Sequence, residues 1–383
     1  MTARPIDEPH RTASPLELLF DLTFVVAVAA VTAELAHSIA DGHPGVVEFL
    51  QVLFAIWWAW MNFTWFASSY DTDDVPYRLL TMVQMAGVLV LAAGVPAAAA
   101  ESDYRAVLFG YLIMRIGLVG QWLRAAYEDP DRRRTALRYA SGIAILQVGW
   151  LLAVFLADLA LPLFVVLVVL ELAVPLWAER VRHTNWHPHH IAERYGLFVI
   201  ILLGESVLAA SRGVQKAIAD GEVGSAFILV SGAGLVLLFA LWWLYFLHPA
   251  GDGLSERRAY SYRWGYGHYL LFAALAAVGA GLEVAVEEAA HHTTSTAVGY
   301  AVAIPVAVFL LMLWLVHAPI LEPPVTKPAM ILGSVALVLL LPLVLPPVAV
   351  VAAVAGVAVL IVAVVLARGN QLASSPGVTR PHS

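Results

Sequence analysis

Three ionisable side chains occur within runs of residues that are otherwise apolar. Glu205 lies in the run 195–210, which reads YGLFVIILLGESVLAA, and Arg115 and Glu171 occupy two further apolar runs. In a helix that begins at Ile191, Glu205 is predicted to lie about 21 Å along the helix axis. The hydrocarbon core is about 30 Å thick, so the carboxylate would be roughly two-thirds of the way across. Arg115 and Glu171 are predicted to lie about 15 Å along their own helices. A charge at such a depth is costly, so Arg115 is expected to have a carboxylate partner.

Two interpretations of these three charges remain open, and they are not exclusive. The charges can form buried ion pairs that hold helices together, or they can line a pathway for a substrate or a proton. The pathway interpretation predicts that Arg115, Glu171 and Glu205 converge on a cavity between two helical halves of the chain.

A second set of charged residues is predicted near the cytoplasmic ends of the helices. Glu17 and Asp21 are four residues apart and therefore share one face of a helix. The segment 14–17 reads SPLE, which is typical of a helix start with a capping serine, an early proline and an acid in the first turn. Asp21 lies one turn deeper and is expected to pair with Arg78 or Arg194.

The composition is that of a membrane protein. Hydrophobic residues make up 61% of the 383 residues and charged residues only 13%, with a mean hydropathy of +0.81. Soluble domains are about one quarter charged, so most of this surface is expected to face lipid. The chain contains no cysteine, which excludes disulfides and thiolate chemistry. It has no block of basic residues, so a nucleic-acid partner is not predicted.

The segment 183–193 carries four histidines and an acid, which invites interpretation as a metal site. His189 and Glu193 are four residues apart and can share a helix face. A zinc site normally needs a third protein ligand at a defined geometry, and the sequence has no cysteine and no HExxH motif. A histidine-rich loop ahead of a helix is the favoured interpretation, and neither a metal nor a cofactor is predicted.

Apolar stretches of about 20 residues predict an all-α, polytopic helix bundle with about twelve transmembrane helices. They lie near 16–37, 46–66, 77–97, 104–125, 136–157, 160–180, 191–212, 224–247, 264–288, 297–317, 328–345 and 347–367. Pro342, Pro346 and Pro347 leave open whether the last two form one broken segment. With a cytoplasmic N-terminus, 17 of the 21 Lys and Arg residues fall on the cytoplasmic side. We therefore expect a multi-pass protein of the cell membrane, with the lipid bilayer as its partner and both termini in the cytoplasm.

A weak internal repeat divides the chain. Trp57 precedes Arg78 by 21 residues, and Trp242 precedes Arg263 by the same interval. Six spans separate the two copies, so the repeat predicts two parallel halves, as in some transporters. Chance is the alternative, because Trp and Arg are both common at membrane interfaces. The predicted division is an N-terminal tail at 1–13, six-helix halves at 14–188 and 189–368, and a C-terminal tail at 369–383.

Several of these segments resemble a known family. The segment 14–28, SPLELLFDLTFVVAV, resembles the start of the bacterial low temperature requirement protein A (LtrA) family. The segment 190–206, HIAERYGLFVIILLGES, is similar to a second signature of that family. The stretches 71–74 (DTDD) and 78–85 (RLLTMVQM) fit between them, and the resemblance runs in order over about residues 14–320.

The resemblance implies an integral membrane protein of a family named for a growth phenotype in the cold. It implies no particular substrate or reaction. The residues at matching motif positions are Glu17, Asp21, Arg78, His190, Glu193, Arg194, Gly204 and Glu205.

The function favoured by these features is a secondary transporter or permease for a small solute, with proton coupling as one form of it. Two alternatives stay open. One is a non-transporting sensor or envelope homeostasis protein. The other is a membrane enzyme that acts at the cytoplasmic face through Asp21, His190 and Glu193, although no nucleophile–base motif occurs. A channel is disfavoured because no filter-like carbonyl loop is visible. The sequence carries no signal for an oligomeric state.

Overall fold

The computed structural model describes residues 1, 3–5, 8, 11–43, 45–155, 161–291, 295–321 and 327–374. Within these residues the chain is helical and contains no β-strand. The α-helices are α1 (Pro15–Ala40), α2 (Val46–Tyr70), α3 (Val75–Ala93), α4 (Val95–Glu101), α5 (Arg105–Glu128), α6 (Arg133–Phe155), α7 (Leu161–Ala178), α8 (Pro188–Asp220), α9 (Ser225–Phe246), α10 (Ala250–Glu256), α11 (Ser261–Ala290), α12 (Thr296–His317), α13 (Pro328–Val344) and α14 (Pro347–Ser374). Two short 3-10 helices, η1 (Pro130–Arg132) and η2 (Arg258–Tyr260), precede α6 and α11.

The described residues include 11 helical segments that are long and apolar enough to cross a membrane. The prediction of an all-α, polytopic membrane bundle is therefore confirmed. Each predicted span corresponds to a helix, and the last two are separate helices, α13 and α14, joined through Leu345 and Pro346. α13 has only 17 residues, which extend about 26 Å and so fall slightly short of the hydrocarbon thickness.

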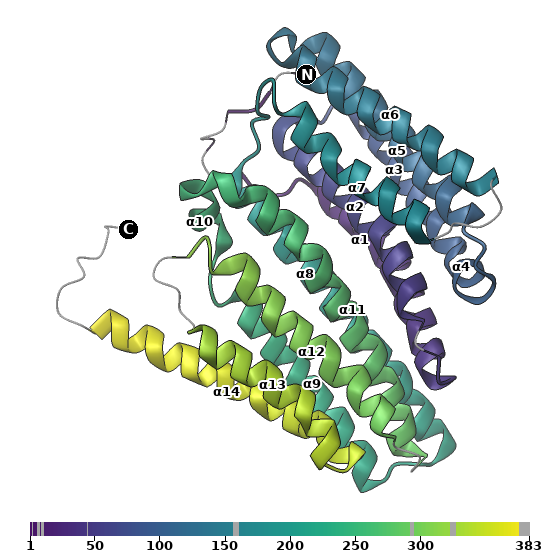
Figure 1. Ribbon diagram of the computed structural model, residues 1–383, viewed down its shortest axis with the longest axis vertical. Helices are drawn as coiled ribbons and strands as arrows, with labels where there is room; N and C mark the ends of the chain where they lie inside the picture. Colours follow the sequence, from purple (N-terminus) through teal and green to yellow (C-terminus); the bar gives the residue numbers. More distant parts are fainter. Residues whose placement is uncertain are drawn as a thin grey trace. The chain divides into compact units, whose positions relative to one another are not determined.

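The first of two compact units comprises Met1–Ile201, which is α1 to α7 and the first part of α8. In this unit α3 packs on α5, α5 on α6, and α6 on α7, while α1 contacts α2 and α3 (Figure 1). α2 is the most buried membrane span of the unit, because nearly every side chain from Gln51 to Tyr70 is buried. Its tryptophans place indole N–H groups in the interior of the unit, where buried acids can use them as hydrogen-bond donors.

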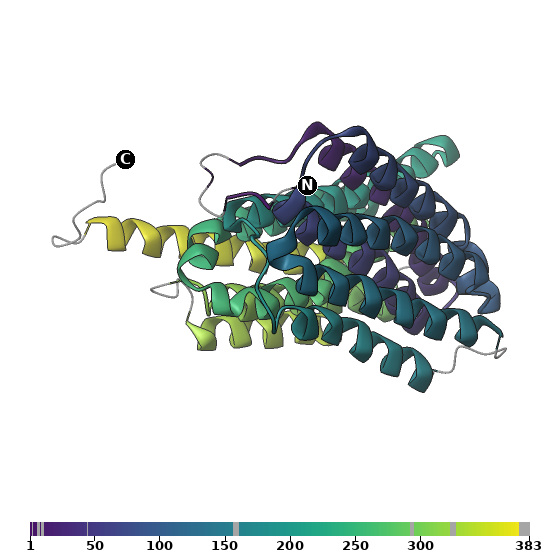
Figure 2. The same ribbon diagram turned by 90° about the horizontal axis from the view of Figure 1, so that it is seen from above.

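The second unit comprises Leu202–Ser383, which contains the rest of α8 and the helices α9 to α14. α11 is its most buried membrane span and packs on α9 and α12, while α14 packs on α9, α12 and α13. Figure 1 shows α9, α11, α12, α13 and α14 running side by side, and Figure 2 shows the chain from above, with α14 in yellow. The boundary between the units falls after Ile201 in α8, whereas the sequence places the division of the halves after residue 188, at the first residue of that helix.

The two tryptophan pairs of the predicted repeat occupy different environments. Trp57 and Trp58 on α2 are buried, and Trp242 and Trp243 on α9 are 45% and 47% exposed. The same 21-residue spacing between Trp and Arg therefore occurs with buried tryptophans on α2 and with exposed tryptophans on α9. Two parallel six-helix halves remain a prediction from the sequence.

Glycines allow α3 and α5 to approach each other closely. A Cβ atom on Gly87 would lie 2.7 Å from the carbonyl oxygen of Gly110, and one on Gly110 would collide with the backbone nitrogen of Leu91. Small residues of this kind let helix backbones come together where lipid supplies little hydrophobic driving force.

Replacing Gly110 by alanine is expected to lower the free energy of unfolding by about 1–3 kcal/mol, because the obstructing atoms belong to the backbone of α3. Unfolding in mixed micelles by SDS titration measures this change. The matched control is Gly356→Ala in α14, where an added Cβ meets nothing within 4 Å. The control is expected to be neutral or slightly stabilising, because alanine is the better helix former. Equal effects of the two substitutions would contradict the close-packing argument.

Candidate functional site

Two acids of α1 form one side of the candidate site. Glu17 and Asp21 lie one turn apart on the same helix face. The helix begins with a capping box, in which the backbone N–H of Glu17 donates to Ser14 Oγ at 3.3 Å and the backbone N–H of Ser14 donates to Glu17 Oε2 at 2.8 Å. Pro15 at the first helical position supports the same start. The capping box fixes Glu17 and leaves its Oε1 atom available to other partners.

Two bases of α8 form the other side, and they too are four residues apart. Arg194 donates through Nη1 to Glu17 Oε1 at 2.7 Å, and through Nη2 and Nε to the two oxygens of Asp21 at 2.6 and 2.9 Å. His190 Nε2 lies 3.0 Å from the same Oε1 of Glu17. Trp60 on α2 donates its indole N–H to Asp21 Oδ1 at 2.7 Å. We refer to Glu17, Asp21, Trp60, His190 and Arg194 as the Arg194 cluster.

The Arg194 cluster is removed from solvent. The side chains of Glu17, His190 and Arg194 are 0% exposed, and that of Asp21 is 3% exposed. With a neutral imidazole, one arginine faces two carboxylates, so the cluster carries one net negative charge. A proton on His190 would make it neutral. The arrangement therefore contains one titratable base beside an uncompensated carboxylate charge.

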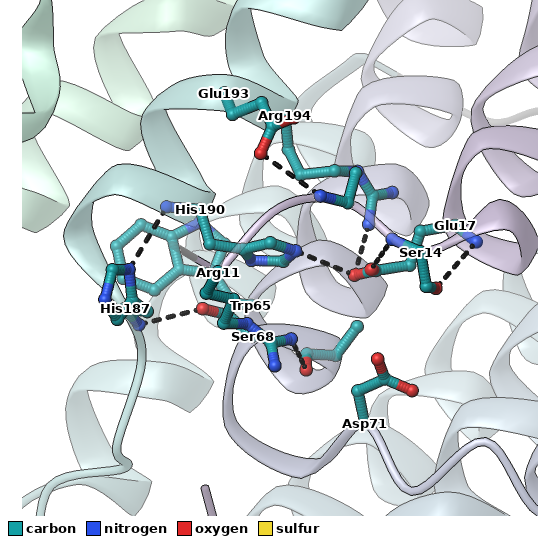
Figure 3. Close-up of polar contacts among 12 residues, drawn as sticks. Arg11, Ser14, Glu17, Trp65, Ser68, Asp71, His187, His190, Glu193 and Arg194 are labelled. Carbon is teal, nitrogen blue, oxygen red and sulfur yellow. Dashed lines mark hydrogen bonds and ion pairs between the residues drawn. The ribbon is translucent and has the colours of Figure 1, made fainter. Parts of the chain in front are cut away.

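The segment that precedes α1 lies against the cluster, as Figure 3 shows. Arg11 Nη2 donates to the carbonyl oxygen of Ala67 at 2.8 Å, and the backbone N–H of Ala13 donates to Glu193 Oε2 at 3.1 Å. The Nε and Nη1 atoms of Arg11 have no hydrogen-bond partner among the described residues. Burial lowers the pKa of Arg11, and the charge of Glu17 opposes that shift. Arg11, Asp71 and Glu193 together add one more negative charge beside the cluster.

Comparison with known proteins identifies the family. The family model described as "Bacterial low temperature requirement A protein (LtrA)" matches residues 12–367, which covers both segments that supply the Arg194 cluster's acids and bases. The chain belongs to the LtrA family. It is also similar to a protein of Rhizobium meliloti (strain 1021) described as "Uncharacterized protein RA0937", with 30% identity over 278 residues. That match covers 67% of this chain and 65% of the relative, so less than two thirds of the relative's length is spanned. This LtrA protein is accordingly a bacterial multi-pass membrane protein.

A second buried cluster of this LtrA protein surrounds Glu171 on α7. The Oε1 atom of Glu171 accepts hydrogen bonds from Tyr111 at 3.0 Å, Trp150 at 3.2 Å and Gln147 at 3.3 Å. Its Oε2 atom accepts from Trp58 at 2.8 Å and lies 3.6 Å from Arg115 Nη2. We refer to these residues as the Glu171 cluster.

Arg115 therefore has the carboxylate partner that its depth requires, although the pair is loose because other donors already saturate Glu171. The arginine also donates to the hydroxyl of Tyr111 and stacks over its ring, with 4.5 Å between Cζ and the ring centroid. Its Nε and Nη1 atoms are buried without a hydrogen-bond partner among the described residues. Arg115 and Glu171 thus come together within the first unit.

Glu205 has other partners. It lies on α8 in the second unit, where Oε1 is 3.3 Å from Arg212 Nη2, about two turns farther along the helix. Arg212 is itself 3.1 Å from Glu283 on α11. The predicted convergence of Glu205 with Arg115 and Glu171 on one cavity stays a prediction.

Two further residues named from the sequence lie outside the Arg194 cluster. Arg78 opens α3 and forms an exposed pair with Asp73 at 2.8 Å, so Asp21 has Arg194 rather than Arg78 as its partner. A charge at the start of a helix can stay in water at little cost, which explains why Arg78 faces outward. Glu193 holds the backbone of Ala13 rather than a side chain of the cluster.

Sequence reasoning did not single out the neutral donors of either cluster. Trp60 and Trp58 lie in an aromatic run on α2, which reads as ordinary hydrophobic core. Tyr111 could have been predicted as a neighbour of Arg115, because it precedes Arg115 by four residues and must share its helix face.

Asp71, in the loop after α2, provides a test outside the membrane-spanning segments. Burial and the nearby charge of Glu17 raise the pKa of Asp71 to about 6, against which Arg11 and Arg4 act. The ordinary aspartate pKa is lower, so the folded protein favours the protonated acid. Ionisation of Asp71 therefore costs stability as the pH rises from about 4 to about 6, and the full cost persists above that range.

Asp71→Asn is expected to stabilise the protein by about 1–3 kcal/mol at pH 7.5 and to have little effect near pH 4. Thermal unfolding in detergent at several pH values measures the difference. Asp73→Asn is the matched control, because Asp73 is exposed and paired with Arg78. A constant difference between wild type and Asp71→Asn across this pH range would contradict the assignment.

Proposed function

We propose that this LtrA protein is a secondary transporter for a small solute and that the Arg194 cluster takes up and releases a proton during the transport cycle. The observation that carries the proposal is a fully buried cluster in which one arginine faces two carboxylates and a histidine. With both carboxylates ionised and the histidine neutral, this set has one excess negative charge. A cluster that serves only to hold helices together gains nothing from an uncompensated charge, which is costly in a low-dielectric interior. Protonation of His190 removes that charge, so proton binding and the stability of the cluster are linked.

The Glu171 cluster supports a transport role for the same unit. Arg115 retains buried N–H groups without a partner among the described residues, although an unsatisfied buried donor costs about 1–3 kcal/mol. A solute with an acceptor oxygen would satisfy these groups on its way through the unit.

The contacts of the acids favour transport over enzymatic activity. Asp21 accepts hydrogen bonds from Arg194 and Trp60, and Glu193 accepts one from the backbone of Ala13. Both carboxylates proposed for a cytoplasmic-face enzyme are therefore already engaged by the protein, and a general base needs an open position toward its substrate.

The test uses the purified protein in liposomes that contain a pH-sensitive dye. Amino acids, sugars, carboxylates and inorganic ions are added in turn to wild type, His190→Gln and Glu17→Gln. A solute-dependent pH change that falls at least 10-fold in both variants is expected. Arg78→Gln, which alters an exposed pair, is the matched control and should retain the signal.

Two results would overturn the proposal. One is a pH change in His190→Gln equal to that of wild type. The other is no flux with any solute, and a pH-dependent change of conformation in that case would favour a sensor.

A further inference from the structure

The second unit contains a groove of about 610 Å³, including its open mouth. It lies among α9, α12, α13 and α14, which run side by side in Figure 1. Most of its lining is apolar and includes Leu310, Ile361 and Val365. The lining residues with a polar side-chain atom are Tyr245, His248, Trp314 and His317. None of the described residues that line the groove is Lys, Arg, Asp or Glu.

The hydrogen bonds of the histidines determine which of their nitrogens can accept. His317 Nδ1 is 3.1 Å from the carbonyl oxygen of Leu313, and a carbonyl only accepts, so Nδ1 carries the proton. The Nε2 atom of His317 is then an acceptor, and no described residue donates to it. The Nε2 atom of His248 is buried and has no hydrogen-bond partner among the described residues, so it can donate to an occupant in the tautomer that carries its proton.

Tyr245 is oriented by the same logic. His268 Nδ1 is 2.7 Å from the carbonyl oxygen of Trp264, so His268 Nε2 is unprotonated and accepts from the Tyr245 hydroxyl at 3.1 Å. The Tyr245 proton is therefore directed at His268 and not into the groove. An occupant of the polar end must bring its own donor to reach His317.

The polar and apolar parts of the groove are separated along the helices in the way that an amphiphile requires. His317 is the last residue of α12, and Leu310 lies two turns earlier, about 10 Å deeper along the helix. On α14, Val365 lies near the end of the apolar stretch and Ile361 one turn deeper. The polar end therefore lies at a helix terminus, where lipid head groups are found, and the apolar part extends toward the bilayer interior.

We propose that this groove binds a membrane lipid with a neutral hydroxyl head group, such as a fatty or isoprenoid alcohol. The hydroxyl donates to His317 Nε2 and accepts from His248, and the hydrocarbon chain lies along Leu310 and Ile361. A phosphate head group is a poor match, because no Lys or Arg occurs among the described lining residues to compensate its charge. This site is independent of the transport proposed for the Arg194 cluster.

The test compares three photoactivatable probes with the same diazirine-bearing hexadecyl chain: the alcohol, its methyl ether and its phosphate monoester. The purified full-length protein is labelled in detergent micelles, and mass spectrometry locates the modified peptides. The alcohol is expected to label the segments 244–248 and 310–318 at least 5-fold more than the ether, as one hydrogen bond to the acceptor predicts. Equal labelling by alcohol and ether would mean ordinary contact with the membrane and would overturn the proposal. Preferential labelling by the phosphate would overturn it in favour of a phospholipid.

Variants distinguish the contribution of the His317 acceptor to labelling from the contribution of the shape of the groove. His317→Phe is expected to abolish the preference for the alcohol, whereas His317→Gln keeps an acceptor oxygen and should retain part of it. Leu310→Trp, which fills the apolar part, is expected to reduce labelling by both probes. Leu337→Phe on the exposed face of α13 is the matched control and should change nothing. Size-exclusion chromatography checks that each variant is folded, and a preference that survives in folded His317→Phe would overturn the proposal.

Discussion

Replacing Arg194 by glutamine is expected to lower the free energy of unfolding by about 3–5 kcal/mol. The arginine makes three hydrogen bonds to Glu17 and Asp21, and all three side chains are buried. Without it, two carboxylates are left in the interior with no cation between them. SDS titration in mixed micelles, followed by tryptophan fluorescence, measures the loss.

A double substitution shows whether the loss comes from the uncompensated charge. Arg194→Gln combined with Asp21→Asn is expected to be more stable than Arg194→Gln alone, because one of the two stranded carboxylates is removed. Arg78→Gln is the control for loss of an arginine and should stay within about 0.5 kcal/mol of wild type, since its pair with Asp73 is exposed. Additive effects of the two cluster substitutions would contradict the coupling.

Glu171→Gln is expected to destabilise the protein by a similar amount, about 3–5 kcal/mol. Four neutral donors converge on this carboxylate, and a glutamine amide would turn its own N–H group toward some of them. The substitution also leaves the buried guanidinium of Arg115 without a counter-charge. The same SDS titration measures the effect.

The second test again relies on a double substitution and a matched control. The double variant Arg115→Gln, Glu171→Gln is expected to lose at least about 1 kcal/mol less free energy of unfolding than the sum of the losses in the two single variants. Glu283→Gln, which alters the partly exposed pair with Arg212, is expected to cost less than about 1 kcal/mol. A Glu171→Gln variant as stable as wild type would show that the carboxylate charge is not needed in the interior.

The neutral partners explain why Arg194 lies closer to its carboxylate than Arg115 does. Asp21 is held by a bidentate arginine and one indole, whereas Glu171 is held by two indoles, a phenol and an amide, with Arg115 farther away. A carboxylate that is already saturated by neutral donors needs its arginine less as a hydrogen-bond donor than as a counter-charge. Of the arginines in the two clusters, Arg115 consequently has fewer of its N–H groups satisfied than Arg194.

The sequence alone determined the helical class, the membrane location and the approximate position of every span. These depend on local quantities, namely apolar runs of about 20 residues and the Gly, Pro and charged residues that bound them. It also predicted that Arg115 needs a carboxylate and that Glu17 and Asp21 share a face, because desolvation cost and the helical repeat follow from composition and spacing.

Only the tertiary structure decided which charges meet. The sequence makes Arg78 and Arg194 equivalent candidates for Asp21, and only the packing of α8 on α1 selects Arg194. Glu205 pairs with Arg212, which also pairs with Glu283 in the same unit. The sequence also did not predict that Trp58 and Trp60 of α2 donate to buried acids. A tryptophan in an aromatic run has the same sequence pattern whether its indole N–H meets an acid or another ring. Which charged side chains meet depends on the rotation and offset of neighbouring helices. These arise from side-chain packing across the bundle and produce no periodic pattern in the sequence of either helix.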